Sequence, residues 1–439
     1  MATVVSKRKF VCVDLKDNHN KYWDVTLFDN GDVLTEWGRV GYGETNGVHL
    51  STQSKTHSGV GQHFVDKKIG EKYAKGYKEI ETIATDSGMS GTVAKTVSSS
   101  SLQKIAQEQI ASKHPLTQKL IAYLTKVNAH NIYEASGGKI EYSDSDGLLK
   151  TARGIITQNA IDQARDLLDK IGNKVNARKF KDDTTIELVE NYLTIVPQHM
   201  GMGRFTVEGF LPDVTAVQKQ NDLLDSLSAS FTAATTAKPK ADSKTDKVAE
   251  APKVFDAKLE LVEDGKVFDR IRRLYESTMN KVHSCYGTKI KSIYTVEIAP
   301  VLEAFEARGK PLGNVMELWH GTKHCHVLSI LKSGLVIPPA SSQYVTGRMF
   351  GPGAYFALQS SKSLNYATGY WGGTRGDRMF MFLCSAALGK YYVPSGPTSS
   401  PPPSGYHSYW AKPRQSGVMN DEIIVQRTYQ CNLNYLLEF

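Results

Sequence analysis

The chain has 439 residues, of which 40% are hydrophobic and 22% are charged. This composition is typical of soluble globular proteins, and the length suffices for about three domains. No run of about 18 apolar residues occurs, and the amino-terminal segment lacks the apolar core of a signal peptide. We therefore expect a protein that stays inside the cell and does not bind membranes.

Charge and cysteine content narrow the class further. The formal net charge is +8, and residues 261–439 carry 19 basic against 12 acidic side chains, whereas residues 1–83 carry 12 against 11. A phosphate-bearing ligand or a polyanion near the carboxy-terminal third is one interpretation, and a solvated basic surface is the other. The five cysteines form no C-x-x-C pair, which favours reduced thiols and argues against a zinc finger.

Two segments of biased composition divide the chain. Residues 86–103 are rich in Ser, Gly and Thr, and residues 232–253 contain no large apolar side chain. Such segments are typical of linkers. The predicted organisation is therefore three domains (1–85, 104–231 and 254–439) separated by linkers at 86–103 and 232–253.

The first block predicts a small α+β domain. Apolar residues alternate on both sides of Asn30-Gly31, a dipeptide typical of tight hairpins. Helical spacing of Phe64, Ile69 and Tyr73 follows. We expect a small sheet covered by one helix.

The middle block predicts an all-α bundle. Apolar residues recur at steps of three and four, and the segment 196–203 contains the Pro and Gly that end a helix. This spacing indicates a bundle core far more often than a cofactor site. The clearest apolar stripe comprises Ile161, Ala164, Leu168, Ile171 and Val175.

The third block predicts an α+β domain without regular strand–helix alternation. Strands are expected at "MELWHG", "GAYFAL", "RMFMFLCSAAL" and "DEIIVQRTY", and helices at "HCHVLSILKSG" and "SSKSLNYATGY". No G-x-G-x-x-G follows a strand; "GRVGYGETNG" has the wrong spacing, which argues against a Rossmann dehydrogenase.

The stretch "LWHGTKHCH" raises the question of a metal site. His324, Cys325 and His326 are consecutive, so on a helix their side chains diverge by about 100° and cannot share one ion unaided. We expect no metal here. His320 differs, because it ends a strand and precedes Gly321, which permits close approach of the backbone to a ligand.

Further candidates follow along the chain. Ser363 and Tyr366 are three residues apart and would share a helix face, while Tyr355 lies just upstream and Glu422 begins a late strand. Two aromatic rings would clamp a flat heterocycle by stacking. Taken singly, each of these residues is more simply explained by packing or by a surface position.

Together these segments resemble a known family. The ordered stretches "LWHGT", "GLVIPPA", "VTGRMFGPGAYFA", "SSKSLNYATGY" and "NDEIIVQRTYQCNLNYLL" resemble the catalytic domain of the poly(ADP-ribose) polymerases. "WGR" at Trp37 to Arg39 resembles that family's WGR domain, and the middle block resembles its helical regulatory domain more loosely. The implied fold class is multidomain: a small α+β WGR domain, an all-α regulatory bundle and an α+β ADP-ribosyltransferase domain.

The resemblance implies that NAD is consumed as an ADP-ribose donor and that no metal is required. Breaking the bond to nicotinamide produces a ribosyl cation, which a carboxylate stabilises, as in glycoside hydrolysis. The implied catalytic residues are His320, Tyr366 and Glu422. The residues implied to bind NAD are Gly321, Thr322, Arg348, Tyr355, Phe356, Lys362 and Ser363.

The implied roles are specific. The Gly321 backbone and the Ser363 hydroxyl would hold the nicotinamide carboxamide, and Tyr366 would stack on its ring. His320 would bond the adenine-side ribose. Glu422 would stabilise the cation and polarise the acceptor hydroxyl, and its presence favours chain extension over single transfer.

The chain also departs from the family pattern. Val336 stands where the family often has Arg, Arg348 where Tyr is common, and His326 where Asn is common. We expect these changes to affect NAD affinity more than reaction type. A mono-ADP-ribosyltransferase and a DNA-end-binding scaffold with weak activity therefore remain alternatives.

The implied partners are DNA ends or nicks, bound through Trp37 and Arg39, and protein acceptors that include the chain itself. Trp37 could stack on a base or sugar and Arg39 could pair with a phosphate, although Trp37 could equally pack in the domain core. The free chain is expected to be a monomer. We expect a nuclear protein if the source is eukaryotic, and a cytoplasmic or host-cell location if it is bacterial or viral.

Overall fold

The computed structural model groups the chain into two compact units, which are described separately. The first unit comprises Met1–Ala94, Ile132–Glu141 and Leu149–Phe231, and the second comprises Lys95–Asn131, Tyr142–Leu148 and Thr232–Phe439. The structure describes residues 2–40, 53–80, 82–83, 99–112, 114–135, 140–142, 149–151, 155–198, 200, 205–236, 255–337, 349–368 and 377–439.

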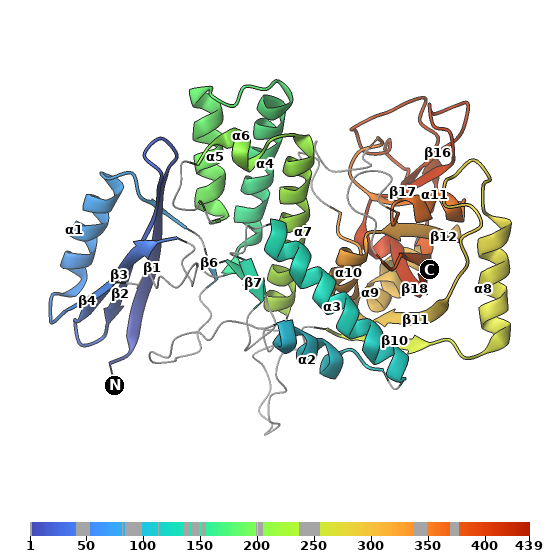
Figure 1. Cartoon of the computed structure of the whole chain (residues 1–439), viewed down its shortest axis with the longest axis horizontal. Helices are drawn as coiled ribbons and strands as arrows, with labels where there is room; N and C mark the ends of the chain where they lie inside the picture. Colours follow the sequence, from blue (N-terminus) through green and yellow to red (C-terminus); the bar gives the residue numbers. More distant parts are fainter. Residues whose placement is uncertain are drawn as a thin grey trace. The chain divides into compact units, whose positions relative to one another are not determined.

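The first unit contains a five-stranded antiparallel sheet in the order β4-β3-β2-β1-β5, coloured blue in Figure 1. The predicted hairpin is confirmed: Leu27 pairs with Val33, and Gly31 in the turn has a φ of +82°, which glycine adopts without strain. The strands are β1 (Val4–Asp14), β2 (His19–Phe28), β3 (Val33–Arg39), β4 (Gln53–His57) and β5 (Lys78–Glu79).

One helix, α1 (Gly61–Tyr73), covers this sheet as predicted. Val65 and Ile69 are buried against a core that includes Phe10 and Trp23. Tyr73 was expected on the buried face, but 48% of it is exposed. Its hydroxyl donates to Glu79, so the polar end of the ring is held at the surface.

The helices of the first unit confirm the predicted stripe, because all five of its residues are at most 3% exposed. Helix α4 begins where the Thr157 hydroxyl accepts the Ala160 N–H, and α5 begins where the Asp182 carboxylate accepts the Thr184 N–H. The elements are α4 (Gln158–Asn176), α5 (Asp183–Ile195), α6 (Val207–Phe210), α7 (Val214–Thr236), and two small strand pairs, β6 (Thr82–Ile83) with β9 (Ile155–Ile156) and β7 (Ile140–Tyr142) with β8 (Leu149–Thr151).

Within this unit, α5 packs on the first strand pair. The Leu15 N–H donates to Glu190 over 2.8 Å, and the buried Asn20 amide donates to the Gln198 carbonyl over 2.9 Å. One backbone N–H and one side-chain amide at the β1–β2 turn thus donate to the helical segment instead of to water. The small sheet and the helices of this unit are therefore in direct contact.

The second unit is built on two antiparallel-rich sheets, ordered β10-β11-β18-β14-β12 and β13-β17-β16-β15. The predicted strands at all four segments are confirmed. The strands are β10 (Ala257–Leu261), β11 (Ser292–Ile298), β12 (Val315–Thr322), β13 (Ala354–Phe356), β14 (Phe380–Ala387), β15 (Tyr391–Tyr392), β16 (Ser408–Ala411), β17 (Glu422–Val425) and β18 (Cys431–Glu438).

Helices surround these sheets. Two of them, at residues 99–109 and 115–135, lie where the sequence predicted a linker or the separate middle domain. Helix α2 begins at Ser99, inside the segment expected to be a linker. The helices are α2 (Ser99–Gln109), α3 (Pro115–Ala135), α8 (Gly265–Ser277), α9 (Ala299–Ala304), α10 (Val327–Ser333) and α11 (Ser360–Asn365), with short turns η1 (Phe305–Gly309), η2 (Lys310–Leu312), η3 (His324–His326) and η4 (Thr428–Gln430).

Trp319 joins the two sheets. Its backbone N–H donates to the Ala357 carbonyl over 3.1 Å, and the Ala357 N–H donates to the Trp319 carbonyl over 3.0 Å. Strand β12 therefore runs beside the end of β13. The Trp319 side chain is 1% exposed and lies in a core cluster with Tyr275, Leu364, Met381 and others. Burying such a large ring fixes the end of β12, on which His320 and Gly321 follow.

Helix α3 contacts the same region of the second unit. The Asn128 amide donates to the Cys325 carbonyl over 2.7 Å and to the Ser329 hydroxyl over 3.1 Å. The Tyr123 hydroxyl bonds the Asp377 carboxylate. In the part of the chain that the structure describes, no helix is long and apolar enough to cross a membrane.

Candidate active site

Four elements of the second unit carry the residues singled out from the sequence. These are the end of β12, the short strand β13, helix α11 and the start of β17. Strand β13 pairs with β17 through Tyr355–Ile424 and Phe356–Ile423. The bridge at Trp319 places β12 beside this pair, so residues far apart along the chain are brought to one region.

Gly321 meets Ser363 at very close range. A Cβ at position 321 would lie 1.6 Å from the Ser363 carbonyl oxygen, so no side chain fits there. The Ser363 hydroxyl donates to the Trp319 carbonyl over 2.9 Å. The hydroxyl oxygen can still accept a hydrogen bond, for example from an amide N–H. Glycine is needed here for close packing of α11 on β12.

The environment of His320 determines its protonation. Its Nδ1 lies 2.9 Å from the Tyr355 carbonyl oxygen, which can only accept, so Nδ1 carries the proton. Burial lowers the pKa of the imidazole, partly offset by that same bond, so the ring is neutral at physiological pH. Nε2 is then an acceptor suited to a hydroxyl donor.

Lys362 and Glu422 form a close ion pair across 60 residues of chain. Lys362 Nζ lies 2.6 Å from Glu422 Oε1 and 3.3 Å from the Asp421 carbonyl oxygen. The two side chains are 13% and 18% exposed, respectively. Burial lowers the pKa of Lys362, and the negative charge of Glu422 opposes that shift. The carboxylate is thereby held in one place.

Tyr366 lies at the end of α11, near this pair. Burial raises the pKa of its phenol to about 12, and the charge of Glu422 acts in the same direction. Tyr366 is therefore a neutral ring beside a carboxylate. Such a ring can stack on a flat, electron-poor heterocycle.

The two predicted NAD-binding residues of β13, Tyr355 and Phe356, are adjacent on the strand and point to opposite sides. The Phe356 ring centroid lies 5.7 Å from that of His320. The Tyr355 hydroxyl accepts the Phe350 N–H over 2.9 Å and donates to the Gly351 carbonyl over 2.7 Å. Tyr355 therefore anchors the turn before β13, a role that the sequence pattern did not indicate.

The remaining predicted NAD-binding residues have different outcomes. Thr322 is 9% exposed at the end of β12. Arg348 lies outside the described residues. Val336, which was named only as a departure from the family pattern, is 37% exposed. Whether these positions contact a ligand stays a prediction.

The histidines after Gly321 have protein partners in the second unit. Cys325 is buried, and the His324 ring lies 6.2 Å from the Tyr123 ring with an edge-on geometry. Residues 324–326 form a 3-10 turn, not the first turn of an α-helix. Their side chains still diverge in such a turn, as the argument against a shared ion requires.

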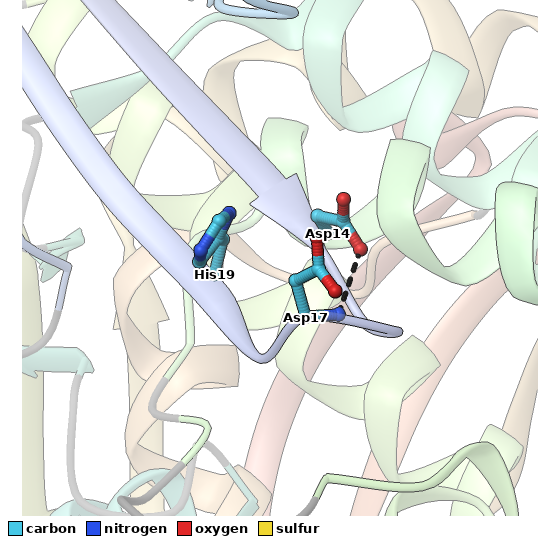
Figure 2. Close-up of side chains that lie close together, drawn as sticks. All are labelled: Asp14, Asp17 and His19. Carbon is cyan, nitrogen blue, oxygen red and sulfur yellow. Dashed lines mark hydrogen bonds between the residues drawn. The ribbon is translucent and has the colours of Figure 1, made fainter.

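Within the described residues, a group of possible metal ligands lies in the first unit, at the β1–β2 turn. Figure 2 shows Asp14, Asp17 and His19 there, with ligand atoms within 4.8 Å of one another. The Asp17 N–H donates to the Asp14 carboxylate over 3.0 Å. This bond is typical of turns that Asp closes, so turn formation explains the position of Asp14 without a metal.

The two predicted DNA-binding residues also have partners inside the first unit. Trp37 Nε1 donates to the Gln53 side chain over 2.6 Å, and its ring packs partly against the core of the sheet. Arg39 donates to both the backbone and the side-chain oxygen of Asn18, over 2.9 and 3.1 Å. These contacts suit a structural role, and DNA contact stays a prediction.

Sequence reasoning missed the polar groups that surround the site. Ser361 of α11 contacts His283, and His283 in turn contacts Asn420. The Trp410 indole N–H donates to Asp421 over 2.7 Å. These contacts span up to 137 residues. No local spacing indicates them, and only the position of Asn420 and Asp421 beside Glu422 offered a signal.

Comparison with known proteins identifies two domains in the chain. Residues 266–439 match the poly(ADP-ribose) polymerase catalytic domain, and residues 6–83 match the WGR domain. The chain is 24% identical to protein mono-ADP-ribosyltransferase PARP3 of Mus musculus, covering 97% of this chain and 86% of the relative. It is 24% identical to poly(ADP-ribose) polymerase 2-A of Oryza sativa subsp. japonica, covering 85% of this chain but only 56% of the relative. This chain therefore combines a WGR domain at residues 6–83 with the catalytic domain of the poly(ADP-ribose) polymerases at residues 266–439.

Proposed function

We propose that the chain is an NAD-dependent ADP-ribosyltransferase, activated by DNA breaks, that transfers ADP-ribose to protein acceptors and extends chains. The observation that carries this proposal is the Lys362–Glu422 ion pair, which holds a poorly exposed carboxylate beside the ring of Tyr366. The match of residues 266–439 to the catalytic domain of this family supports it.

The proposed chemistry begins at the bond between nicotinamide and ribose. That bond breaks with its electron pair going to nicotinamide, and the ribose carbon gains positive charge. A fixed carboxylate near the sugar stabilises this charge. An acceptor hydroxyl or carboxylate oxygen then bonds to the carbon; where the acceptor is a hydroxyl, its proton passes to Glu422 or water.

The binding roles follow from the geometry of the side chains. The Gly321 backbone and the Ser363 hydroxyl oxygen, which lie on two directly packed elements, would hold the carboxamide, and the neutral Tyr366 ring would stack on nicotinamide. His320 presents Nε2 as an acceptor for a ribose hydroxyl. Held substrates need little reorganisation on the way to the transition state.

The product type is proposed to be a chain of ADP-ribose units because Glu422 is present. A single-unit transferase is the second candidate. One observation favours it: the mouse relative, whose match covers 97% of this chain, bears the name mono-ADP-ribosyltransferase. The rice relative, named a poly(ADP-ribose) polymerase, is much longer than the region it shares with this chain.

Regulation and location are proposed from the WGR domain. Its match at residues 6–83 supports binding to DNA ends or nicks, for which Trp37 and Arg39 are the proposed residues, and supports a nuclear location in a eukaryote. NAD is consumed as substrate, and no metal is needed for the steps above. The DNA partner and the acceptors, including the chain itself, are proposals.

A labelling experiment tests the function. The purified chain is incubated with radiolabelled NAD, with and without a nicked duplex, and resolved on a denaturing gel. A DNA-dependent ladder supports chain extension, a sharp band supports single transfer, and absence of label contradicts the proposal. Glu422→Gln should lower nicotinamide release by roughly 100- to 1,000-fold, whereas Glu297→Gln, at an exposed position on β11, should not change it.

A further inference from the structure

A surface loop between α8 and β11, here named the brace loop (residues 278–285), touches β12, α11 and the segment that leads into β17. Trp319, the residue before His320, donates from Nε1 to the Thr278 hydroxyl over 3.1 Å. The Ser360 N–H donates to the Thr278 carbonyl over 3.1 Å, at the start of α11. The loop therefore contacts both β12 and α11.

The centre of the brace loop grips Ser361, the residue before Lys362. The Asn280 N–H and His283 Nδ1 each lie 2.8 Å from the Ser361 hydroxyl oxygen, and Cys285 Sγ lies 3.1 Å from the Ser361 carbonyl oxygen. Ser361 is fully buried. A buried hydroxyl with this many partners has little freedom to move.

His283 also reaches the third element. Its Nε2 lies 3.2 Å from the amide nitrogen of Asn420, two residues before Glu422. The neighbours of His283, Val282 and Ser284, are exposed, and so is Met419 beside Asn420. In each of these two surface segments one polar side chain points inward, and these side chains, His283 and Asn420, contact each other.

The hydrogen bonds specify the form of the imidazole. An amide nitrogen only donates, so Nε2 of His283 accepts and carries no proton. The proton of the neutral ring then lies on Nδ1 and is donated to Ser361, whose own hydroxyl points to the Asn280 carbonyl. Burial, and then the charge of Lys362, lower the pKa of His283, in agreement with a neutral ring.

We propose that His283 is a positioning residue for the transfer reaction: its imidazole ties Ser361 to Asn420 and thereby sets the distance between Lys362 and Glu422. This inference rests on the proposed function, because it assigns a role in that reaction. His283 acts through other groups and touches no reacting atom. Its loss should therefore lower turnover more than NAD binding.

Three substitutions separate the two bonds of the ring. His283→Ala removes both. His283→Asn leaves an amide near the Nδ1 position, within reach of Ser361 only, while His283→Gln places an amide oxygen near Nε2, where it can accept from Asn420. His63→Ala, at an exposed position on α1, is the matched control.

The expected results concern nicotinamide release with water as the acceptor. His283→Ala and His283→Asn should lower kcat by about 10- to 100-fold with the KM for NAD changed by less than about threefold, because displacement of a positioned group by about 1 Å has effects of this size. His283→Gln keeps the bond to Asn420, and Asn280 and Cys285 still hold Ser361 to the same loop, so this variant should recover to within about threefold of the wild type. Asn420→Ala should add little to His283→Ala. An unchanged kcat in His283→Ala, a loss seen only with protein acceptors, or independent effects of the two sites would each overturn the inference.

A second measurement does not depend on activity. Hydrogen–deuterium exchange of the peptide that contains Asn420 and Glu422 should be faster in His283→Ala than in the wild type, and close to the wild type in His283→Gln. Equal exchange in all variants overturns the positioning role. If the variants showed these differences in exchange but the wild type released no nicotinamide, only the proposed function would be refuted.

Discussion

Gly321→Ala is the substitution for which the structure makes the sharpest prediction. The new Cβ would lie 1.6 Å from the Ser363 carbonyl oxygen, and real Cβ atoms do not approach such an atom closer than 3.0 Å. Because the obstacle is backbone, not a flexible side chain, α11 and β12 must separate by roughly 1.4 Å. That displacement moves Ser363 and Tyr366 away from the end of β12.

The magnitude follows from two effects. Overpacking of this kind costs about 2 kcal/mol of unfolding free energy, which corresponds to a Tm lower by roughly 4–8 °C. Misplacement of binding groups by about 1 Å lowers kcat/KM for NAD by roughly 100-fold. Melting followed by circular dichroism and nicotinamide release measured by chromatography give the two quantities.

A matched glycine provides the control. Gly265, the first residue of α8, has no atom within 4 Å of the position of a Cβ, so Gly265→Ala should leave both quantities within error of the wild type. If Gly321→Ala retained wild-type kcat/KM, the packing of α11 on β12 would not control the site. The argument that the Gly321 backbone and the Ser363 hydroxyl hold a carboxamide would then be wrong.

Three further predictions follow from the same geometry. Because burial lowers the folded-state pKa of His320 below its ordinary 6.5, protonation favours the unfolded state, and the unfolding free energy should fall as the pH drops below about 6.5. Urea unfolding between pH 5 and 8 should show a smaller fall in His320→Gln. Tyr355→Phe leaves the Phe350 N–H and the Gly351 carbonyl without their partner, and should lower the unfolding free energy by about 1–2 kcal/mol, whereas Tyr286→Phe, at an exposed position, should not; equal urea midpoints would contradict the anchoring role. Arg39→Ala should lower the Tm in the absence of DNA, because the bonds to Asn18 close the β1–β2 turn; a loss of DNA binding at unchanged Tm would show that the guanidinium serves the nucleic acid alone.

Local patterns predicted most of the secondary structure. The Asn30-Gly31 turn and the stripe from Ile161 to Val175 are properties of a few neighbouring residues, and both elements formed as expected. The order of β12, β13, α11 and β17 was likewise available from the sequence. The short helix α11 also formed as predicted, although it has only six residues. Packing against β12 stabilises it, whereas helix propensity alone would not.

Contacts between distant residues could not be predicted in this way. The ion pair between Lys362 and Glu422 and the contact between His283 and Asn420 depend on how strands and loops come together in space. The expectation for Tyr73 failed because helical spacing does not show whether a phenol hydroxyl finds a partner at the surface. Arg39 and Tyr355 show the same limit: the residue types suggested ligand contacts, and the structure gives both of them partners within the protein.

The most direct test of the central claim is a crystal structure of the chain with nicotinamide or a non-hydrolysable NAD analogue. We predict a carboxamide within hydrogen-bonding distance of Gly321 and Ser363, a pyridine ring stacked on Tyr366, and the Glu422 carboxylate beside the adjoining ribose. Ligand bound elsewhere, with these side chains left in contact only with protein and water, would contradict the account.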